Sequence, residues 1–196
     1  MPLLWLIWRW SQNQLGFNKI ETVARYTGDW TLRFLLLTLT ITPLKRIRGW
    51  GPLQLYRRML GLFAFFYGTL HFLHYIAVDR QWDLMGLVED FTFRRFFIAG
   101  LVAWALMIPL AATSTNAAIR RLGGKRWQAL HRLVYVSAIL GVIHYYWQAK
   151  AIVVEPVYYA AILAVLLLYR VTYSILKSRS ASRHNGRTNP QRHRED

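Results

Sequence analysis

Three histidines stand inside long apolar stretches of this sequence. His131 and His144 lie in residues 127–148, and His71 lies in a second apolar stretch, residues 56–78. A helix of roughly 20 residues crosses the hydrocarbon core of a bilayer, so both stretches are long enough to span a membrane. Ionisable side chains within membrane spans usually face the bundle interior and mark a ligand or a relay. The sequence therefore predicts that these imidazoles bind haem iron.

Depth in the membrane decides which histidines pair. The distribution of basic residues predicts that both stretches run outward from the cytoplasm, which places His71 and His144 at the same outer level. Two imidazoles from neighbouring helices can supply both axial positions of one haem and leave its iron six-coordinate, which suits electron transfer. His131 precedes His144 by about 20 Å of ideal helix. It defines an inner level, so one or two haems are expected.

The inner level lacks a second histidine. Arg57 lies about 21 Å before His71 along an ideal helix and within roughly 40° of the same face, where a fourth histidine would complete a second pair. Its guanidinium stays protonated and is a poor iron ligand, so Arg57 is expected to pair with haem propionates or to approach the iron. A straight helix would hold His131 and His144 about 140° apart. We therefore expect a wide turn near Gly141, or haems reached from different sides.

A less specific interpretation stays open for each side chain. A histidine between membrane helices is often a hydrogen-bonding packing residue, worth about 1 kcal/mol. His74, one turn beyond His71, is expected to join Tyr75 in an aromatic belt at the interface. Arg126 and Arg132 flank the inner histidine and either hold propionates or serve as positive charges at the cytoplasmic end of a span.

The composition predicts a membrane protein. Hydrophobic residues make up 55% of the 196 residues and nine are tryptophan, as expected for membrane helices with aromatic belts. The chain has no cysteine, which excludes disulfides, cysteine nucleophiles and iron–sulfur clusters held by thiolates. Any iron must therefore have nitrogen or oxygen ligands.

The net charge of +16 is unevenly distributed. Lysine and arginine gather in residues 45–58, 120–132 and 170–196, whereas seven of the nine acidic residues lie outside these clusters. Basic segments that alternate with acidic or neutral ones between apolar spans follow the positive-inside rule and place the C-terminus in the cytoplasm. Membrane topology thus accounts for the charge, and no nucleic-acid partner is predicted.

Membrane helices are the elements that would position the histidines. The predicted fold class is an all-α integral membrane protein, a bundle of five complete transmembrane helices plus a short or truncated first helix, with haem held between helices. A polar connection is predicted at residues 11–28, and Pro43 is expected to end the first complete span. Residues 1–177 are expected to form one haem-binding domain, and residues 178–196 a disordered basic cytoplasmic tail. The spans are residues 29–44, 56–78, 93–112, 127–148 and 157–176, and the short first run is residues 1–10.

Four segments carry a resemblance to a known family. They are PLLWLIW near the start, TGDWTLRFLLLTLTITPL, RRMLGLFAFFYGTLHFLHY, and KRWQALHRLVYVSAILGVIHYYW. Up to about Lys177 the chain resembles the haem-binding membrane subunits of periplasmic methionine sulfoxide reductase systems, the MsrQ or YedZ family, within the ferric-reductase-like transmembrane group. By this resemblance His71, His131 and His144 match the haem-associated histidines of the family.

The resemblance implies a b-type cytochrome in the inner membrane of a bacterium. Such a subunit takes electrons from quinol or from a soluble flavin reductase. It passes them to a periplasmic molybdopterin enzyme of the MsrP type, which restores methionine from its sulfoxide. The chain would be a non-catalytic electron-transfer subunit. The resemblance also implies FMN, but the sequence shows no flavin motif and no residues are assigned to it.

Two other classes of protein share some of these features. A self-contained metalloreductase or oxidase would need an FAD and nicotinamide domain after the last helix, and the tail after Lys177 is too short for one. A transporter or channel would use intramembrane histidines to relay protons or bind metal ions. We disfavour this class because we expect no carboxylate buried within a span and see no inverted repeat.

Overall fold

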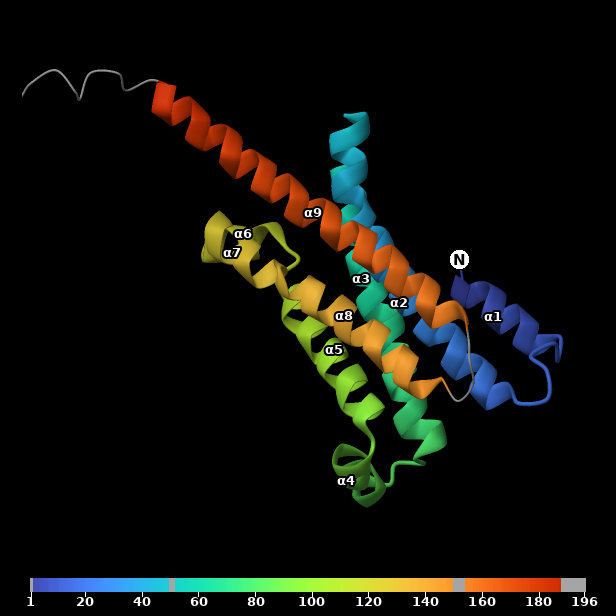
Figure 1. Ribbon diagram of the computed structural model, residues 1–196. Coiled ribbons are helices and arrows are strands. Elements are labelled where there is room, and N and C mark those ends of the chain that lie inside the picture. Colours follow the sequence, from blue (N-terminus) through green and yellow to red (C-terminus); the bar gives the residue numbers. More distant parts are fainter. Residues whose placement is uncertain (1, 50–51, 150–153, 188–196) are drawn as a thin grey trace, which may run out of the picture.

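The computed structural model describes residues 2–49, 52–149 and 154–187, and every regular element in these ranges is a helix (Figure 1). This confirms the predicted all-α class. The elements are α1 (Pro2–Ser11), α2 (Lys19–Arg48), α3 (Leu53–His74), the π-helix η1 (Tyr75–Asp79), α4 (Leu84–Phe93), α5 (Arg95–Ala112), α6 (Asn116–Leu122), α7 (Gly124–His131), α8 (Leu133–Gln148) and α9 (Val154–Arg187).

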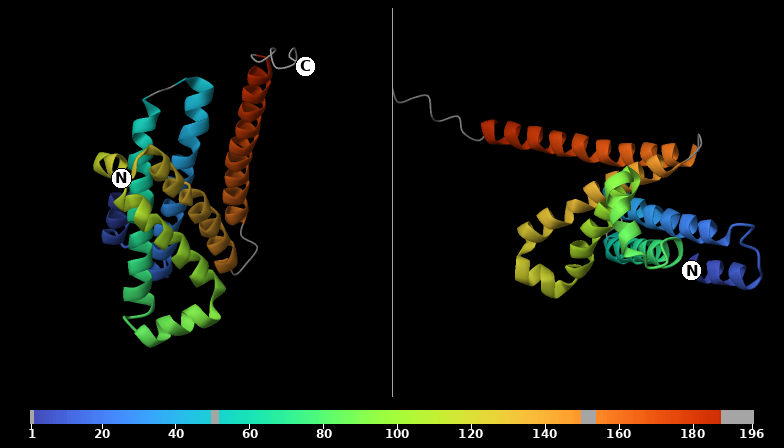
Figure 2. Two further views of the ribbon diagram at one scale, coloured as in Figure 1. Left: turned by 90° about the vertical axis from the view of Figure 1, so that its left-hand side faces the viewer. Right: turned by 90° about the horizontal axis from the view of Figure 1, so that it is seen from below.

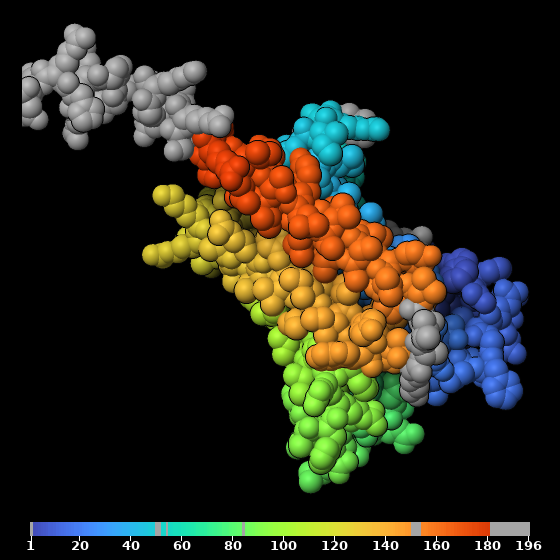
Figure 3. Space-filling view, in the orientation of Figure 1, coloured from blue at the N-terminus to red at the C-terminus, as the bar shows by residue number. Residues whose placement is uncertain are grey.

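Helices α2, α3, α5 and α8 form the centre of the bundle. α2 packs along α3, α5 packs along α8, and α9 lies against α2 and α8 (Figure 1, Figure 2). In the view of Figure 3, α9 lies across the front of the molecule. The core combines leucines of α2 with small residues of its neighbours, and Leu39, Ala64 and Ala138 have no exposed surface. Small side chains let membrane helices approach closely.

Three helical stretches are long and apolar enough to cross a membrane: Leu55–Asp79, Arg95–Ala112 and Val154–Ser180. They carry exposed large apolar side chains such as Leu168, as expected where a surface faces lipid. The other two predicted spans differ, because α2 has charged residues near both ends and α8 has only 16 residues. The membrane class is confirmed, whereas the count of five complete spans stays a prediction.

Helix α2 begins at Lys19, well before residue 29. The Asn18 side chain accepts a hydrogen bond from the Glu21 amide at 3.1 Å and donates one to the Glu21 carboxylate at 3.1 Å. This reciprocal pair is a variant of the capping box, which marks the start of a helix. The predicted polar connection is therefore wrong for residues 19–28, which form the first turns of α2.

Pro43 lies inside α2 and does not end it. Proline has no amide hydrogen, so the carbonyl of Leu39, one turn earlier, lacks its helical partner. Arg170 of α9 supplies the replacement, because its Nη2 donates to the Leu39 oxygen at 2.5 Å. The helix continues to Arg48, and Gly49 closes it in a left-handed conformation. The helix continues past Pro43 because a distant side chain satisfies the orphaned carbonyl, and the end of the membrane span at Pro43 and the basic residues after it stays a prediction.

Residues 127–148 form two helices instead of the single predicted span. α7 ends at His131, Arg132 stands in a turn, and α8 begins directly after it. The chain passes Gly141 as regular helix, so the predicted wide turn at that glycine is wrong. His131 therefore lies at the end of α7 and His144 lies on α8, so the two histidines belong to different helices.

The described part of the chain begins and ends in helices. α9 extends to Arg187, and residues 188–196 lie outside the described residues, so the disordered basic tail at residues 178–196 stays a prediction. α1 packs on α2 and α3. The Tyr67 hydroxyl accepts a hydrogen bond from the Leu3 amide at 2.8 Å, and Tyr26 donates to the Pro2 carbonyl at 2.9 Å.

The acidic segment after η1 folds into a clamp around Asp90 of α4. The Asp90 side chain is 1% exposed, accepts from Nε of Arg80 at 2.6 Å and Nε of Arg94 at 3.0 Å, and also accepts from the Tyr75 hydroxyl. Burial alone raises the pKa of Asp90. Hydrogen bonds from Tyr75 and Arg80 and the charges of both arginines outweigh it and hold that pKa below its usual value. The clamp fixes α4 to η1 and α5.

Candidate functional site

His71 lies on α3 against α2. Its Nδ1 donates to the carbonyl oxygen of Ala24 at 2.9 Å, and the Thr27 hydroxyl lies 3.4 Å from the same nitrogen. The ring packs on Gly28, where an added Cβ would stand 3.2 Å from the imidazole Cε1. Because a carbonyl only accepts, Nδ1 carries the proton and Nε2 keeps a free lone pair.

His144 lies on α8 against α5 and is held in the same way. Its Nδ1 donates to the carbonyl oxygen of Phe96 at 2.7 Å. A Cβ on Gly100 would stand 2.6 Å from this nitrogen, closer than real Cβ atoms come, so only glycine lets the ring lie where it does. This imidazole also keeps its Nε2 free for a metal.

The structure brings His71 and His144 together. Their ring centroids are 6.1 Å apart and their planes meet at 81°. A bond from a metal to imidazole nitrogen is about 2 Å long and the ring centre lies about 1 Å further on, so two imidazoles on opposite sides of one metal have centroids about 6 Å apart. Ligating histidines almost always donate their other ring N–H to a carbonyl or carboxylate, as both rings do here.

The donor set fits a haem better than a bare metal ion. Among the described residues, no group of three or more His, Cys, Asp or Glu side chains gathers at one point. A structural metal ion held by protein alone takes about four ligands, whereas a porphyrin brings its own nitrogens and needs only axial ligands from the protein. Gly28 and Gly100 leave open the two places where a side chain would meet an imidazole.

His131 lies apart from this pair, at the end of α7. Its ring stacks on Trp127 with centroids 3.9 Å apart, and its Nε2 is 3.1 Å from the Thr113 hydroxyl. Trp127 in turn donates to the Thr113 carbonyl at 2.9 Å. Arg57 is close enough for its positive charge to act on the imidazole. The assignment of His131 and Arg57 to an inner level stays a prediction.

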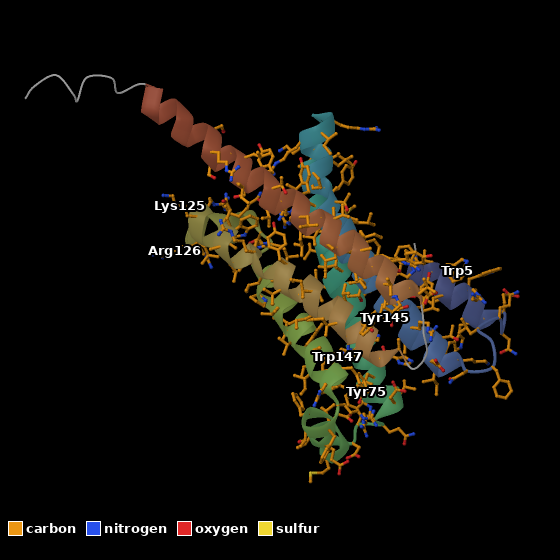
Figure 4. The ribbon with its side chains drawn as sticks, in the orientation of Figure 1. Trp5, Tyr75, Lys125, Arg126, Tyr145 and Trp147 are labelled. Atoms are coloured by element: carbon orange, nitrogen blue, oxygen red, sulfur yellow. The ribbon has the colours of Figure 1, made fainter. Side chains whose placement is uncertain are left out.

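The opposite ends of the bundle carry different side chains (Figure 4). Lys125 and Arg126 project from α7 at one end, whereas Tyr75, Tyr145 and Trp147 lie toward the other. Arg126 and Lys125 are exposed, as positive charges at the end of a span would be.

The sequence does not mark the groups that hold the two imidazole rings. Both acceptors, at Ala24 and Phe96, are main-chain carbonyls, and every residue type offers that atom, so no signal marks them. Gly100 carries a usable signal, because it lies within a predicted span and a glycine within a helical pattern often has a packing reason. Gly28 carries no such signal, because the sequence places it in the polar connection of residues 11–28.

Asp29 bears on the expectation that no carboxylate is buried within a span. It lies within α2, is partly buried, and interacts with the Tyr145 hydroxyl, which donates to the Glu155 carboxylate at 3.0 Å. The prediction that no span holds a buried carboxylate is wrong to this extent. The reason is the early start of α2, which carries this aspartate well inside the helix.

Residues 27–142 match the model of the family described as ferric reductase like transmembrane component. The chain is also 52% identical over 173 residues to a protein of Ralstonia nicotianae named protein-methionine-sulfoxide reductase heme-binding subunit MsrQ, an alignment that covers 87% of this chain and 80% of that protein. The chain belongs to the MsrQ family. MsrQ of Herminiimonas arsenicoxydans is 52% identical over 164 residues, 83% of this chain and 75% of its own. MsrQ of Rhodospirillum rubrum is 46% identical over 181 residues, 92% of this chain and 86% of its own. The resemblance of the four sequence segments to MsrQ is thereby confirmed.

Proposed function

We propose that this MsrQ family member is the haem-binding electron-transfer subunit of a membrane-bound protein-methionine-sulfoxide reductase system. Its relatives are named as the heme-binding subunits of such a system, and its apolar helices are of membrane-spanning length. The haem would be of the b type, because covalent attachment of a c-type haem requires cysteines and the chain has none. Residues 1–177 would form the haem-binding domain.

The pairing of His71 with His144 is the observation that carries this proposal. Their ring centroids are 6.1 Å apart, each Nδ1 is engaged by a carbonyl and each Nε2 is free, which supports the proposal that the two imidazoles would together hold one haem iron. A packing role for the two histidines would require neither this spacing nor the same tautomer on both rings.

When bound, the haem supplies one-electron redox chemistry. The residues of the chain orient the two imidazoles and leave room for their rings. The carbonyls of Ala24 and Phe96 orient both imidazoles and make their free nitrogens more basic. Gly28 and Gly100 let the rings lie close to α2 and α5. His71 and His144 would together hold the haem iron, an arrangement that would suit electron transfer.

The charges of the two ends support a direction of transfer. Lys125 and Arg126 mark the end that would face the cytoplasm, and the exposed carboxylates Asp83 and Glu89 mark the end that would face the periplasm of a bacterial inner membrane. Quinol or a soluble flavin reductase would donate electrons. A periplasmic molybdopterin enzyme of the MsrP type would accept them at the end where α4 lies. FMN, which the family resemblance implies, would be a second redox cofactor.

A second haem at the inner level would be placed by His131 and Arg57. The Thr113 hydroxyl occupies Nε2 of His131, which leaves Nδ1 as the nitrogen that could meet iron. Arg57 would neutralise a propionate there. The chain would then carry haems at two depths, one near each face of the membrane.

Visible and electron paramagnetic resonance spectra of the purified chain test the proposal. We expect a Soret band that shifts on reduction and a low-spin signal that His71→Ala and His144→Ala each abolish. His74→Ala is the matched control, one turn further along α3, and should keep both signals. Circular dichroism would verify that each variant is folded. A folded chain that stays colourless when supplied with haem would refute the proposal and favour a transporter or channel.

A further inference from the structure

Three arginines from three helices gather at the inner side of the bundle. Arg170 of α9 lies within the apolar stretch Val154–Ser180 and is partly buried. Arg46 of α2 reaches α9 one turn beyond Arg170, where its guanidinium lies 3.9 Å from the centre of the Tyr173 ring. The positive charges of Arg46 and of Arg57 on α3 both act on Arg170. An arginine inside a membrane span requires a partner, because transfer of its charge away from water is costly.

No described carboxylate lies near these arginines to serve as that partner. The ion pairs of the described residues involve only Glu21 and Asp90, both toward the outer face. Seven acidic residues lie in the outer part of the chain, and the other two, Glu195 and Asp196, lie outside the described residues. The positive charge of the three arginines is therefore uncompensated within the described part of the chain.

Arg170 turns into the bundle and makes only neutral contacts. It donates to the Leu39 carbonyl at 2.5 Å and to the Leu166 carbonyl at 3.3 Å, and its guanidinium lies 5.2 Å from the centre of the Tyr135 ring. A guanidinium has five N–H donors in a planar fork. Two of them are used in these contacts, so donors remain for an anion.

Arg46 sets the depth of the cluster. Its guanidinium lies over the Tyr173 ring at 3.9 Å, which ties the inner end of α2 to α9. Tyr173 lies about 29 Å from the start of α9 at 1.5 Å per residue, and the hydrocarbon core of a bilayer is about 30 Å thick. The cluster therefore stands at the depth of the inner headgroups, where phosphate is the common anion.

We propose that Arg46, Arg57 and Arg170 form a binding site for a phosphate group between α2, α3 and α9. Planar guanidinium forks match phosphate oxygens, and basic pockets between membrane helices on the cytoplasmic side hold phosphorylated headgroups. Two sources share this chemistry: an anionic phospholipid of the inner leaflet, and a free phosphate monoester such as that of a mononucleotide. The site does not depend on haem binding at His71 and His144.

The experiment uses the full chain with its bound haem and has two arms. In one arm, the chain is placed in phosphatidylcholine discs with or without cardiolipin, and retained lipid is measured by native mass spectrometry. In the other, FMN and inorganic phosphate are titrated calorimetrically in a neutral detergent. We expect binding in at least one arm that Arg46→Gln weakens about tenfold, the loss of one charge-assisted contact. Lys125→Gln, which removes an exposed charge from the same end, should change it less than about twofold.

The pattern of outcomes separates the two sources. Retention of cardiolipin that Arg46→Gln impairs identifies a lipid headgroup, and impaired titration by FMN identifies a nucleotide phosphate. Arg57→Gln should act in the same direction, but Arg46→Gln is decisive because Arg57 also belongs to the proposed inner haem site. Equal losses in Lys125→Gln and Arg46→Gln, or binding in neither arm, would overturn the site.

Discussion

The guanidinium of Arg170 and the carbonyl of Leu39 are hydrogen-bonded although they lie 131 residues apart in the sequence. Leu39 is wholly buried, and Pro43 deprives its carbonyl of the usual helical donor. The proline and the arginine are therefore a matched pair, because each would leave a polar group unsatisfied without the other.

A double-mutant cycle tests this pair. Arg170→Leu should lower the free energy of unfolding by about 1–3 kcal/mol, because it leaves a buried acceptor without a donor. Pro43→Ala restores an amide at that position, so Arg170→Leu in the Pro43→Ala background should cost clearly less. Denaturant unfolding in a neutral, phosphate-free detergent gives the four values. Strictly additive costs would show that the two residues act independently.

Two glycines should differ in their tolerance of a methyl group. Gly100→Ala would place Cβ 2.6 Å from Nδ1 of His144, and the overpacking should cost about 1–3 kcal/mol and lower the haem content. Gly28→Ala, at 3.2 Å from the His71 ring, should have a smaller effect. Gly61→Ala is the control, because its Cβ would meet only a Thr38 methyl at 3.8 Å. The haem-to-protein ratio of each purified variant is the measurement. A Gly100→Ala variant with full haem content would contradict the proposed position of the ring.

The outer and inner levels should respond separately to mutation. His131 is held by Trp127 and Thr113 on α7, away from the His71 and His144 pair. We expect His131→Ala to keep the low-spin spectrum of the outer pair and to remove only signal that belongs to an inner haem. Redox titration of the Soret band would resolve the two levels. Loss of the whole spectrum in His131→Ala would mean that the levels are assigned incorrectly.

Acid should loosen the clamp that holds α4. The pKa of Asp90 is lower in the folded chain than in an unfolded one, so its stabilising effect is fully present above the unfolded value of about 3.9. That effect is lost as the pH falls through the lower folded value. Asp90→Asn should destabilise the protein at pH 7 by about 3 kcal/mol and flatten this part of the pH dependence. Thermal unfolding from pH 7 downward provides the check, with Glu89→Gln, which changes an exposed neighbour, as the control.

The close approach of His71 and His144 could be predicted from the sequence. Apolar length and the distribution of charge predict the direction of each helix, and that direction predicts which histidines lie at the same level. The early start of α2 was also visible in principle, as the Asn18 and Glu21 capping signal. The sequence does not indicate the break at Arg132. It also does not indicate that α2 continues through Pro43, because that continuation depends on Arg170, a side chain from a distant part of the chain.

The groups that aim the two imidazoles are both main-chain oxygens, at positions 24 and 96. Because an exchange of the Ala24 or Phe96 side chain would leave that oxygen in place, mutation can remove the acceptor only by moving a whole helix. The orientation of the two imidazoles therefore depends on how α2 and α5 pack. It can be conserved while the side chains at positions 24 and 96 change in evolution.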